Sequence, residues 1–178
     1  DEFPSVQFHL LKENLGFSGG NNFGFKFCNT EFVLFLNPDI LLIEDCITPL
    51  INFFENNSNV GISSCLLLNE DKSLQSSFGG KRGILVEFVE AFYFLIPIFK
   101  AIKMYFIGLK IKKGIPFKVA WTSGAFILTK SSFYRDVGGF DKDYPLNYED
   151  MDLCAKYFEK NLSIFIYPET KCIHLESR

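Results

Sequence analysis

The chain has 178 residues, which is long enough for one domain with a sizeable core and too short for two. Hydrophobic residues make up 48% of it and aromatic residues 17%, so a disordered chain is excluded. A formal net charge of −3 excludes the strong positive field on which nucleic-acid binding depends. We therefore expect one globular domain over residues 1–178, with no nucleic-acid partner.

The first residues combine an alternating apolar pattern with a run of glycines. Val6, Phe8 and Leu10 are separated by single residues, which predicts a strand. The glycines that follow predict a loop, and they are Gly16, Gly19, Gly20 and Gly24. Their spacing fits neither G-x-G-x-x-G nor the P-loop, so both nucleotide motifs are excluded. Taken alone, the stretch is typical of a turn.

A strand, a helix and a second strand follow. Residues 32–36 are an uninterrupted apolar run, as in a strand buried on both faces of a sheet, and the run ends at Asn37-Pro38-Asp39. Residues 43–54 carry apolar side chains at helical spacing, and a new strand is predicted from Val60. This order predicts an α/β fold with a mostly parallel central sheet flanked by helices.

The most hydrophobic stretch lies at residues 84–112. Glutamates and lysines interrupt it, and Pro97 is expected to break any single helix. Its longest uncharged run, residues 91–99, is about half of what a bilayer span requires. A core-covering helical hairpin, a transmembrane helix and a segment lying on a membrane all stay open. In the last case Lys110, Lys112 and Lys113 would touch anionic headgroups.

The last third supplies further elements and an acidic cluster. Residues 117–130 predict a strand broken at Ser123-Gly124, and a short helix from Ser131 and a glycine turn follow. Glu149, Asp150 and Asp152 then begin a helix, with Asn147 as its expected cap. A final strand leads to a loop that carries His174.

The cysteines indicate a reducing compartment. They are odd in number, scattered mostly through apolar runs and without a C-x-x-C pair: Cys28, Cys46, Cys65, Cys154 and Cys172. We expect reduced core residues in a cytoplasmic protein. The chain begins at Asp1 rather than at a methionine, so we interpret it as a fragment or an altered chain.

Each polar candidate has a structural interpretation when it is considered alone. Glu149 and Asp150 are what helix capping and the helix dipole favour at a helix start. Asp39 follows a buried strand at its carboxyl end, where α/β sheets bind ligands. An aspartate with a structural role in a turn is also common at this position. His174 alone is typical of a surface or hydrogen-bonded histidine.

The joint order of these motifs is specific. "NLGFSGGNNFG", "VLFLNPD", "WTSGAFIL" and "VGGFDKDYPLNYEDMDLC", followed by a strand and His174, closely resemble family 2 glycosyltransferases of the GT-A fold. The resemblance runs from about Phe8 to His174, and the most similar group is the bacterial rhamnosyltransferase-like enzymes of surface polysaccharide synthesis. It implies inverting, metal-dependent transfer of a sugar from a dTDP-, UDP- or GDP-sugar to a glycan or lipid-linked saccharide. Such an enzyme would work at the cytoplasmic face of a membrane, with residues 84–112 as its peripheral contact.

The resemblance also implies roles for single residues at the donor. Asp39 corresponds to the last acid of the family's D-x-D motif and would bind Mg²⁺ or Mn²⁺ against the diphosphate, while His174 would complete the metal site. The loop that passes the nucleotide is matched by Asn14, Gly16, Gly20 and Asn22. The segment beside donor sugar and acceptor is matched by Trp121, Ser123 and Gly124.

For the acidic cluster the resemblance implies catalysis. Asp150 is the second acid of the "ED" pair, so it would be the general base that takes the acceptor proton, and Glu149 would be its neighbour on the acceptor side. The helix start is expected to lower the pKa of this carboxylate, which keeps it ionised but weakens it as a base. Asp152 is expected to cap or orient the helix.

The sequence departs from the family at its ends. Family members usually have a further N-terminal portion, with the first strand and an acidic residue that contacts the base, so we expect a partial domain. A catalytically inactive sugar-nucleotide-binding or scaffold module is the alternative that this departure favours. A membrane-surface interaction protein driven by residues 84–109 is a third hypothesis.

Overall fold

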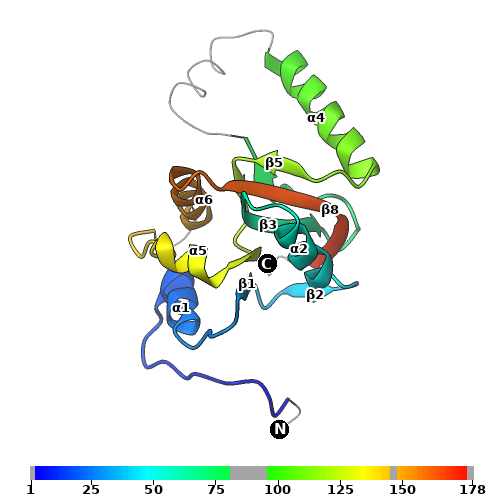
Figure 1. Cartoon of the computed structure of the whole chain (residues 1–178). Helices are drawn as coiled ribbons and strands as arrows, with labels where there is room; N and C mark the ends of the chain where they lie inside the picture. The colour runs from blue at the N-terminus through cyan, green and yellow to red at the C-terminus, as the bar shows by residue number, and fades with distance from the viewer. Residues whose placement is uncertain (1–2, 81–95, 145–147, 176–178) are drawn as a thin grey trace.

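The computed structural model describes residues 3–80, 96–144 and 148–175. They form a central sheet with helices on both faces (Figure 1). The strand order is β1 (Phe32–Leu36), β7 (Phe126–Lys130), β3 (Val60–Leu68), β8 (Ser163–His174) and β2 (Ile40–Leu42), and β5 (Phe117–Val119) also pairs with β8.

The strand directions correct one part of the predicted fold. The α/β class is confirmed, but the sheet is mixed rather than mostly parallel among the described residues. β3 and β8 form the only parallel pair of neighbouring strands there, whereas β7 runs antiparallel to both β1 and β3, and β2 and β5 run antiparallel to β8. An apolar run predicts that a strand is buried. The direction of a strand depends on the chain connections between strands, which hydrophobic periodicity does not predict.

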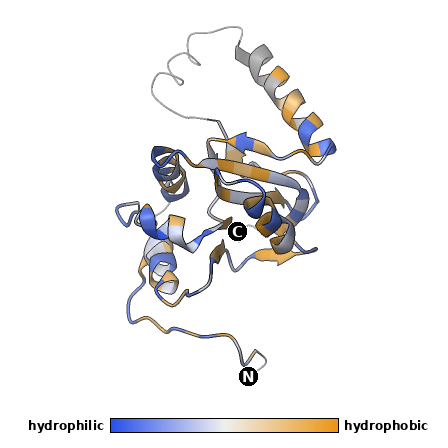
Figure 2. Cartoon of the chain, in the orientation of Figure 1, coloured by the Kyte–Doolittle hydropathy of each residue, from blue (hydrophilic) through white to orange (hydrophobic). Residues whose placement is uncertain are grey.

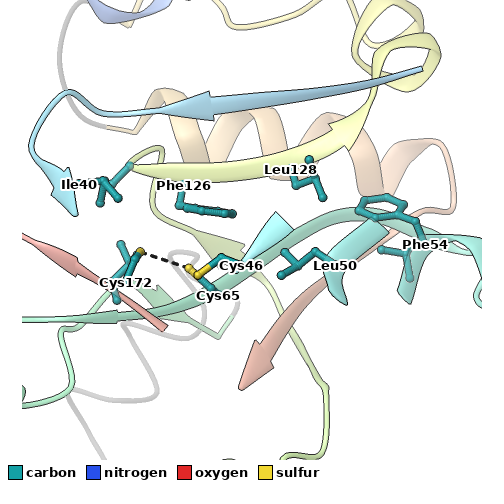
Figure 3. Close-up of a cluster of buried hydrophobic side chains, with 11 residues drawn as sticks. Ile40, Cys46, Leu50, Phe54, Cys65, Phe126, Leu128 and Cys172 are labelled. Atoms are coloured by element: carbon teal, nitrogen blue, oxygen red, sulfur yellow. Dashed lines mark hydrogen bonds between the residues drawn. The ribbon is translucent and has the colours of Figure 1, made fainter. Parts of the chain in front are cut away.

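Two apolar layers hold the helices on the sheet. On one face lie α1 (Gly16–Phe25), α5 (Ser131–Asp136) and α6 (Glu149–Glu159), around a cluster that includes Phe35, Tyr134 and Leu153. The other face is covered by α2 (Ile47–Glu55), whose Leu50 and Phe54 pack toward Phe126 and Leu128 (Figure 3). Burial of these side chains is the main favourable term in the stability of the sheet.

Four of the five cysteines lie in this core, as the sequence predicts. Cys46, Cys65 and Cys172 gather beneath α2, where the sulfurs of Cys65 and Cys172 are 3.3 Å apart (Figure 3). Cys154 is buried under α6, where burial raises its pKa to about 12. All five cysteines are free thiols, and Cys28 is only partly buried.

A second, two-stranded sheet and one helix lie beside the central sheet. Strands β4 (Phe78–Gly79) and β6 (Trp121–Thr122) form a two-stranded sheet, and α4 (Ile96–Lys112) lies beside β5 and β8 (Figure 1). Ile107 and Ile111 of α4 pack with Phe78 of β4 against a cluster made by Leu66, Phe117 and Ile166. Pro97 lies in the first turn of α4, where a missing N–H costs nothing. Residues 81–95 lie outside the described residues, so the prediction that Pro97 breaks a longer helix stays untested.

The open alternatives for residues 84–112 are only partly resolved. Residues 81–95 lie outside the described residues, so a helical hairpin stays untested. None of the described helices combines the length and the apolar character that crossing a membrane requires.

Several predicted elements are confirmed. These are the strands at residues 32–36 and from Val60, the helix from Ser131, the glycine turn and the acidic helix. The helix predicted from residue 43 begins only at Ile47, because Asp45 Oδ1 accepts the N–H groups of Ile47 and Thr48 at 3.0 Å and caps it there. Strand β2 ends at Leu42, so residues 43–46 connect it to α2.

Two predictions near the N-terminus are wrong. Residues 6–10 form no strand, and Phe8 and Leu10 are 86% and 100% exposed. An alternating pattern forms a strand only when it pairs with a neighbouring strand, and residues 6–10 pair with none of the described strands. The glycine-rich stretch is the helix α1 rather than a loop. Phe17 and Phe25 pack against the core, and this tertiary contact overrides the poor helix propensity of glycine.

Candidate active site

An open cleft of about 470 Å³ lies where α6 begins beside the turn between β6 and β7. It is lined by Phe17, Asn37, Trp121, Ser123, Gly124, Ala125, Tyr148, Glu149, Asp150 and Met151. The sequence motifs of β1, β6 and α6 therefore meet at one place. A cleft of this size is within the range of pockets that hold small molecules.

Asp150 is fixed in the wall of this cleft by two backbone donors. Its Oδ2 accepts the N–H of Gly124 at 3.2 Å and its Oδ1 accepts the N–H of Met151 at 2.7 Å. Burial nevertheless raises the pKa of the carboxyl above its usual value, against the lowering effect of both bonds. The expected lowering by the helix start is thus wrong in sign, because desolvation outweighs it. A raised pKa makes the ionised carboxylate a stronger base.

Glu149 lies beside Asp150 at the start of α6. It is buried, and its Oε2 has no hydrogen-bond partner within the part of the chain that the structure describes. Burial, and then the negative charge of Asp150, raises the pKa of Glu149. Two carboxyls whose surroundings favour retaining a proton therefore stand side by side on the cleft wall.

The residue before α6 shapes the entry to the cleft. Tyr148 is the N-cap in the left-handed region (φ 69°), and its exposed ring lines the cleft. The expected cap, Asn147, lies outside the described residues. A tyrosine in this conformation is strained, which is common at binding and catalytic sites.

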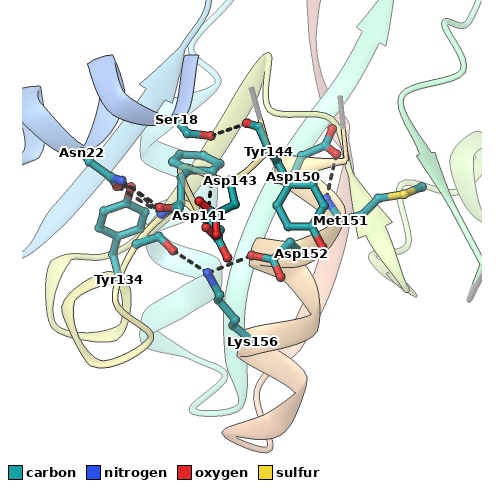
Figure 4. A network of polar contacts seen from close by, with 12 residues as sticks. Ser18, Asn22, Tyr134, Asp141, Asp143, Tyr144, Asp150, Met151, Asp152 and Lys156 are labelled. Atoms are coloured by element: carbon teal, nitrogen blue, oxygen red, sulfur yellow. Dashed lines mark hydrogen bonds and ion pairs between the residues drawn. The ribbon is translucent and has the colours of Figure 1, made fainter. Parts of the chain in front are cut away.

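A polar network holds the start of α6 against α1 and α5 (Figure 4). The Asn22 side chain donates to the Phe140 carbonyl at 2.8 Å and accepts from the Tyr134 hydroxyl at 2.6 Å and from the Phe140 N–H at 3.1 Å. Lys156 pairs with Asp152 at 2.8 Å and donates to the Gly139 carbonyl at 3.3 Å. Asp152 pairs within its own helix, and Lys156 makes the contact from α6 to the turn at Gly139. That Asp152 caps or orients the helix stays a prediction.

The four residues expected at the nucleotide loop do not line this cleft. Asn14 Oδ1 accepts the N–H of Gly16 at 2.9 Å just before α1, and a Cβ added to Gly20 would meet no atom within 4 Å. The Asn22 amide makes the contacts described above and acts as a positioning group. Phe17 of α1 reaches the cleft instead.

The segment expected beside the donor sugar does line the cleft. Trp121, Ser123 and Gly124 are all at its wall. A Cβ added to Gly124 would lie 2.9 Å from the Phe17 ring and 3.8 Å from Asp150 Cβ, so a side chain here would have to displace that ring. Sequence reasoning missed five lining residues, although each lies within two positions of a residue that it named: Phe17, Asn37, Ala125, Tyr148 and Met151.

Asp39 and His174 form a second polar site two residues beyond Asn37. Their Oδ1 and Nε2 atoms are 3.2 Å apart, and the pairing of β2 with β8 brings them together. His174 is the last residue of β8 rather than part of a loop. Gln75 Oε1 lies 2.9 Å from Nδ1, and in the tautomer whose Nδ1 donates to it, Nε2 keeps the lone pair that a metal requires.

This pair fits the implied divalent cation. Two adjacent ligands of an octahedral ion stand about 3 Å apart, which matches the observed separation of Oδ1 and Nε2. Within the described residues there is no group of three or more His, Cys, Asp or Glu side chains that could hold a metal. The protein would therefore supply two ligands and leave the others to water or to a diphosphate.

Comparison with known families decides the assignment. The profile of the family described as "Glycosyl transferase family 2" matches residues 1–125. The chain belongs to this family. A family 2 glycosyltransferase is what the motif order predicts.

Curated relatives agree with the family. The chain is 28% identical over 169 residues to rhamnosyltransferase WbbL of Escherichia coli (strain K12), covering 89% of this chain and 60% of that protein. It is 24% identical over 155 residues to the low-salt glycan biosynthesis hexosyltransferase Agl10 of Haloferax volcanii, covering 85% and 46%. The chain thus spans less than two thirds of the length of either relative.

A solved structure confirms the fold. The crystal structure of GalNAc-T7 with UDP, GalNAc and Mn²⁺ superimposes with a TM-score of 0.66 at 10% identity, covering 94% of this chain and 31% of that one. At this identity the likeness shows the fold alone. The GT-A fold predicted for this family 2 glycosyltransferase is confirmed.

Proposed function

We propose that this chain carries the catalytic site of an inverting glycosyltransferase, which moves a sugar from a nucleoside diphosphate to a hydroxyl of a glycan or lipid-linked saccharide. The observation that carries the proposal is the Asp150 carboxyl, which two backbone N–H groups hold in the cleft wall and whose pKa is raised by burial. Membership of family 2 and the resemblance to a rhamnosyltransferase support the same reaction.

Asp150 acts as the general base in this reaction. Its ionised carboxylate takes the proton of the acceptor hydroxyl as that oxygen forms a bond to the anomeric carbon. The bond from the anomeric carbon to the phosphate oxygen breaks, and the nucleoside diphosphate leaves with the electron pair. Attack from the side opposite the leaving group inverts the configuration. Backbone donors keep Asp150 at one place, which saves the entropy of orienting the base.

The cleft wall orients the two substrates. Trp121 and Tyr148 offer aromatic faces on which a sugar ring can stack, and Ser123 offers a hydroxyl for its oxygens. Glu149, with its raised pKa, holds a hydrogen-bonding carboxyl beside the base.

Asp39 and His174 would hold Mg²⁺ or Mn²⁺. A divalent cation bound there supplies positive charge that stabilises the departing diphosphate. Asp39 contributes the hard oxygen that both ions prefer, and the imidazole of His174 suits Mn²⁺ better than Mg²⁺. Gln75 fixes the ring orientation of His174.

The expected donors are dTDP-, UDP- and GDP-sugars, and the resemblance to a rhamnosyltransferase places dTDP-rhamnose first among those to be tested. The acceptor would be a growing surface polysaccharide. A lipid-linked acceptor would place the enzyme at the cytoplasmic face of the membrane, as a peripheral protein.

The test is Asp150→Asn, assayed with each donor class and a lipid-linked saccharide. Loss of the base is expected to reduce transfer by about 10²- to 10⁴-fold, while nucleotide binding measured by calorimetry stays intact. Asp152→Asn is the matched control, because it alters the same helical turn and removes only the pair with Lys156. Full transfer by Asp150→Asn would exclude this residue as base. Nucleotide binding without turnover in the unmodified chain would instead support a binding module.

A further inference from the structure

Helix α4 has apolar side chains on two opposite sides. Ile107 and Ile111, one turn apart, face the body of the protein and pack against the cluster formed by Leu66, Phe117 and Ile166. Ile102, Tyr105 and Phe106 have the i, i+3, i+4 spacing of another common face, and they are 48%, 65% and 58% exposed. We call these three residues the outer face of α4. A helix that buries only one of two apolar sides leaves the other for a partner.

The charge of this segment is unlike that of the rest of the chain. Residues 96–113 contain five lysines and no acidic residue, whereas the whole chain has a net charge of −3. Lys110, Lys112 and Lys113 gather at the C-terminal end of the helix, and the first two of these are in its last turn. Figure 2 shows the same division, with hydrophobic residues along α4 and hydrophilic ones at its end. The outer face is thus apolar and bordered by positive charge.

This combination fits an anionic lipid surface. Aromatic and aliphatic side chains enter the boundary between headgroups and acyl chains, while lysines extend their stems toward the phosphates. Aromatic residues such as Tyr105 are favoured at this depth because one end of the ring is apolar and the other polar. An acidic surface of another protein would complement the lysines. It would not complement three exposed apolar side chains at helical spacing.

Helix α4 is connected to the cleft through β4 and β6, so a membrane contact at its outer face would bear on the active site. The inner face of α4 packs with Phe78 of β4, and β4 pairs with β6, whose Trp121 lines the cleft. Figure 1 shows α4 reaching beyond the sheet on the side of β5. A membrane bound at the outer face would therefore lie next to the layer that borders the active site.

We propose that the outer face of α4, with the lysines at its end, docks this enzyme on an anionic membrane. The proposal deepens the proposed function, since it names the surface from which a lipid-linked acceptor would be drawn. It does not depend on sugar transfer, because docking is a property of the helix surface.

The test is co-sedimentation of the chain with phosphatidylcholine vesicles, with and without phosphatidylglycerol. Binding is expected to the vesicles that contain phosphatidylglycerol and to fall as salt screens the lysines. Tyr105→Ser combined with Phe106→Ser is expected to weaken this binding by about tenfold or more. Leu42→Ser with Ile43→Ser is the matched control, because these side chains are about as exposed but lie on and beside β2.

The charge contribution is tested separately. Lys110→Glu with Lys112→Glu is expected to remove the preference for phosphatidylglycerol, whereas Lys72→Glu with Lys142→Glu, at two other exposed lysines, leaves it unchanged.

The proposal is overturned if vesicle binding is unaltered both by Tyr105→Ser with Phe106→Ser and by Lys110→Glu with Lys112→Glu. A dimer that Tyr105→Ser with Phe106→Ser converts to a monomer, without vesicle binding by either form, also overturns it and assigns the face to a second copy. Nucleotide binding by all these variants, measured by calorimetry, separates failed docking from failure of the proposed function.

Discussion

At the scale of single residues, Asp150 couples stability and activity to pH in opposite directions. Burial raises its pKa, so the folded protein keeps this proton to a higher pH than the unfolded chain does. Between the two pKa values the folded state binds more protons, and its stability falls as the pH rises. The general base must be ionised, however, so transfer rises through the same range.

Asp150→Asn is therefore expected to gain stability relative to the unmodified chain as the pH rises from acidic to neutral. Denaturant unfolding of both proteins at a series of pH values measures this difference. Asp45→Asn is a control of opposite sign, because the backbone N–H of Thr48 lowers the Asp45 pKa and its contribution is lost as the pH falls. A stability difference for Asp150→Asn that grows toward acidic pH would contradict the burial argument.

Gly124 lies where an added side chain would collide with the Phe17 ring. A methyl group at this position would lie 2.9 Å from the Phe17 ring, so Gly124→Ala is expected to cost about 1–3 kcal/mol of unfolding free energy and to displace the ring into the cleft. Thermal unfolding and donor affinity are the measurements.

Gly20→Ala is the matched substitution, because the added methyl meets no atom and lies inside α1. It is expected to stabilise the protein by about 0.5–1 kcal/mol through the higher helix propensity of alanine. Equal destabilisation by the two substitutions would show that the space around Gly124 is not what excludes a side chain.

At the scale of elements, Asn22 links α1 to the turn that precedes α6. Its amide contacts the Tyr134 hydroxyl and both backbone groups of Phe140, and both of these residues are buried. Asn22→Ala removes the donor to the Phe140 carbonyl and the acceptor of the Tyr134 hydroxyl, although the Phe140 N–H still donates to Tyr134 Oη at 3.2 Å. We therefore expect a loss of about 1–3 kcal/mol of unfolding free energy together with slower transfer. Unfolding curves and kcat give the two effects.

Asn21→Ala tests whether the link itself matters. Asn21 precedes Asn22 on α1, and its side chain donates to the Phe17 carbonyl of its own helix, which is its one side-chain hydrogen bond within the described residues. A change within about 0.5 kcal/mol is expected for it. If Asn22→Ala and Asn21→Ala have the same effect on kcat, Asn22 does not position α6.

At the scale of the whole molecule, the sequence predicts features that depend on neighbouring residues better than features that depend on residues far along the chain. The acidic helix, the buried strands and the glycine turn follow from local periodicity and turn chemistry. The helix at Gly16–Phe25 does not, because its stability comes from Phe17 and Phe25 packing on distant residues. The raised pKa of Asp150 likewise depends on burial, which one sequence does not show.

The pairing of Asp39 with His174 joins residues from opposite parts of the chain. Metal binding at this pair therefore requires the folded state. Separated by 135 positions, they meet only when β2 pairs with β8. A ligand that binds only the folded state stabilises it by RT ln(1 + [L]/Kd), or about 2.7 kcal/mol at 100 times Kd. Mn²⁺ with the matching nucleoside diphosphate, chosen from UDP, dTDP and GDP, is therefore expected to raise the melting temperature more than either alone.

His174→Ala should abolish that joint stabilisation while leaving the smaller effect of the nucleotide. His9→Ala is the control, because His9 stacks on Phe27 at a ring distance of 4.0 Å, away from β8. Thermal unfolding with and without Mn²⁺ measures each case. A joint shift that survives His174→Ala would mean that the histidine is not a metal ligand and that Gln75 and Asp39 hold it for a structural reason.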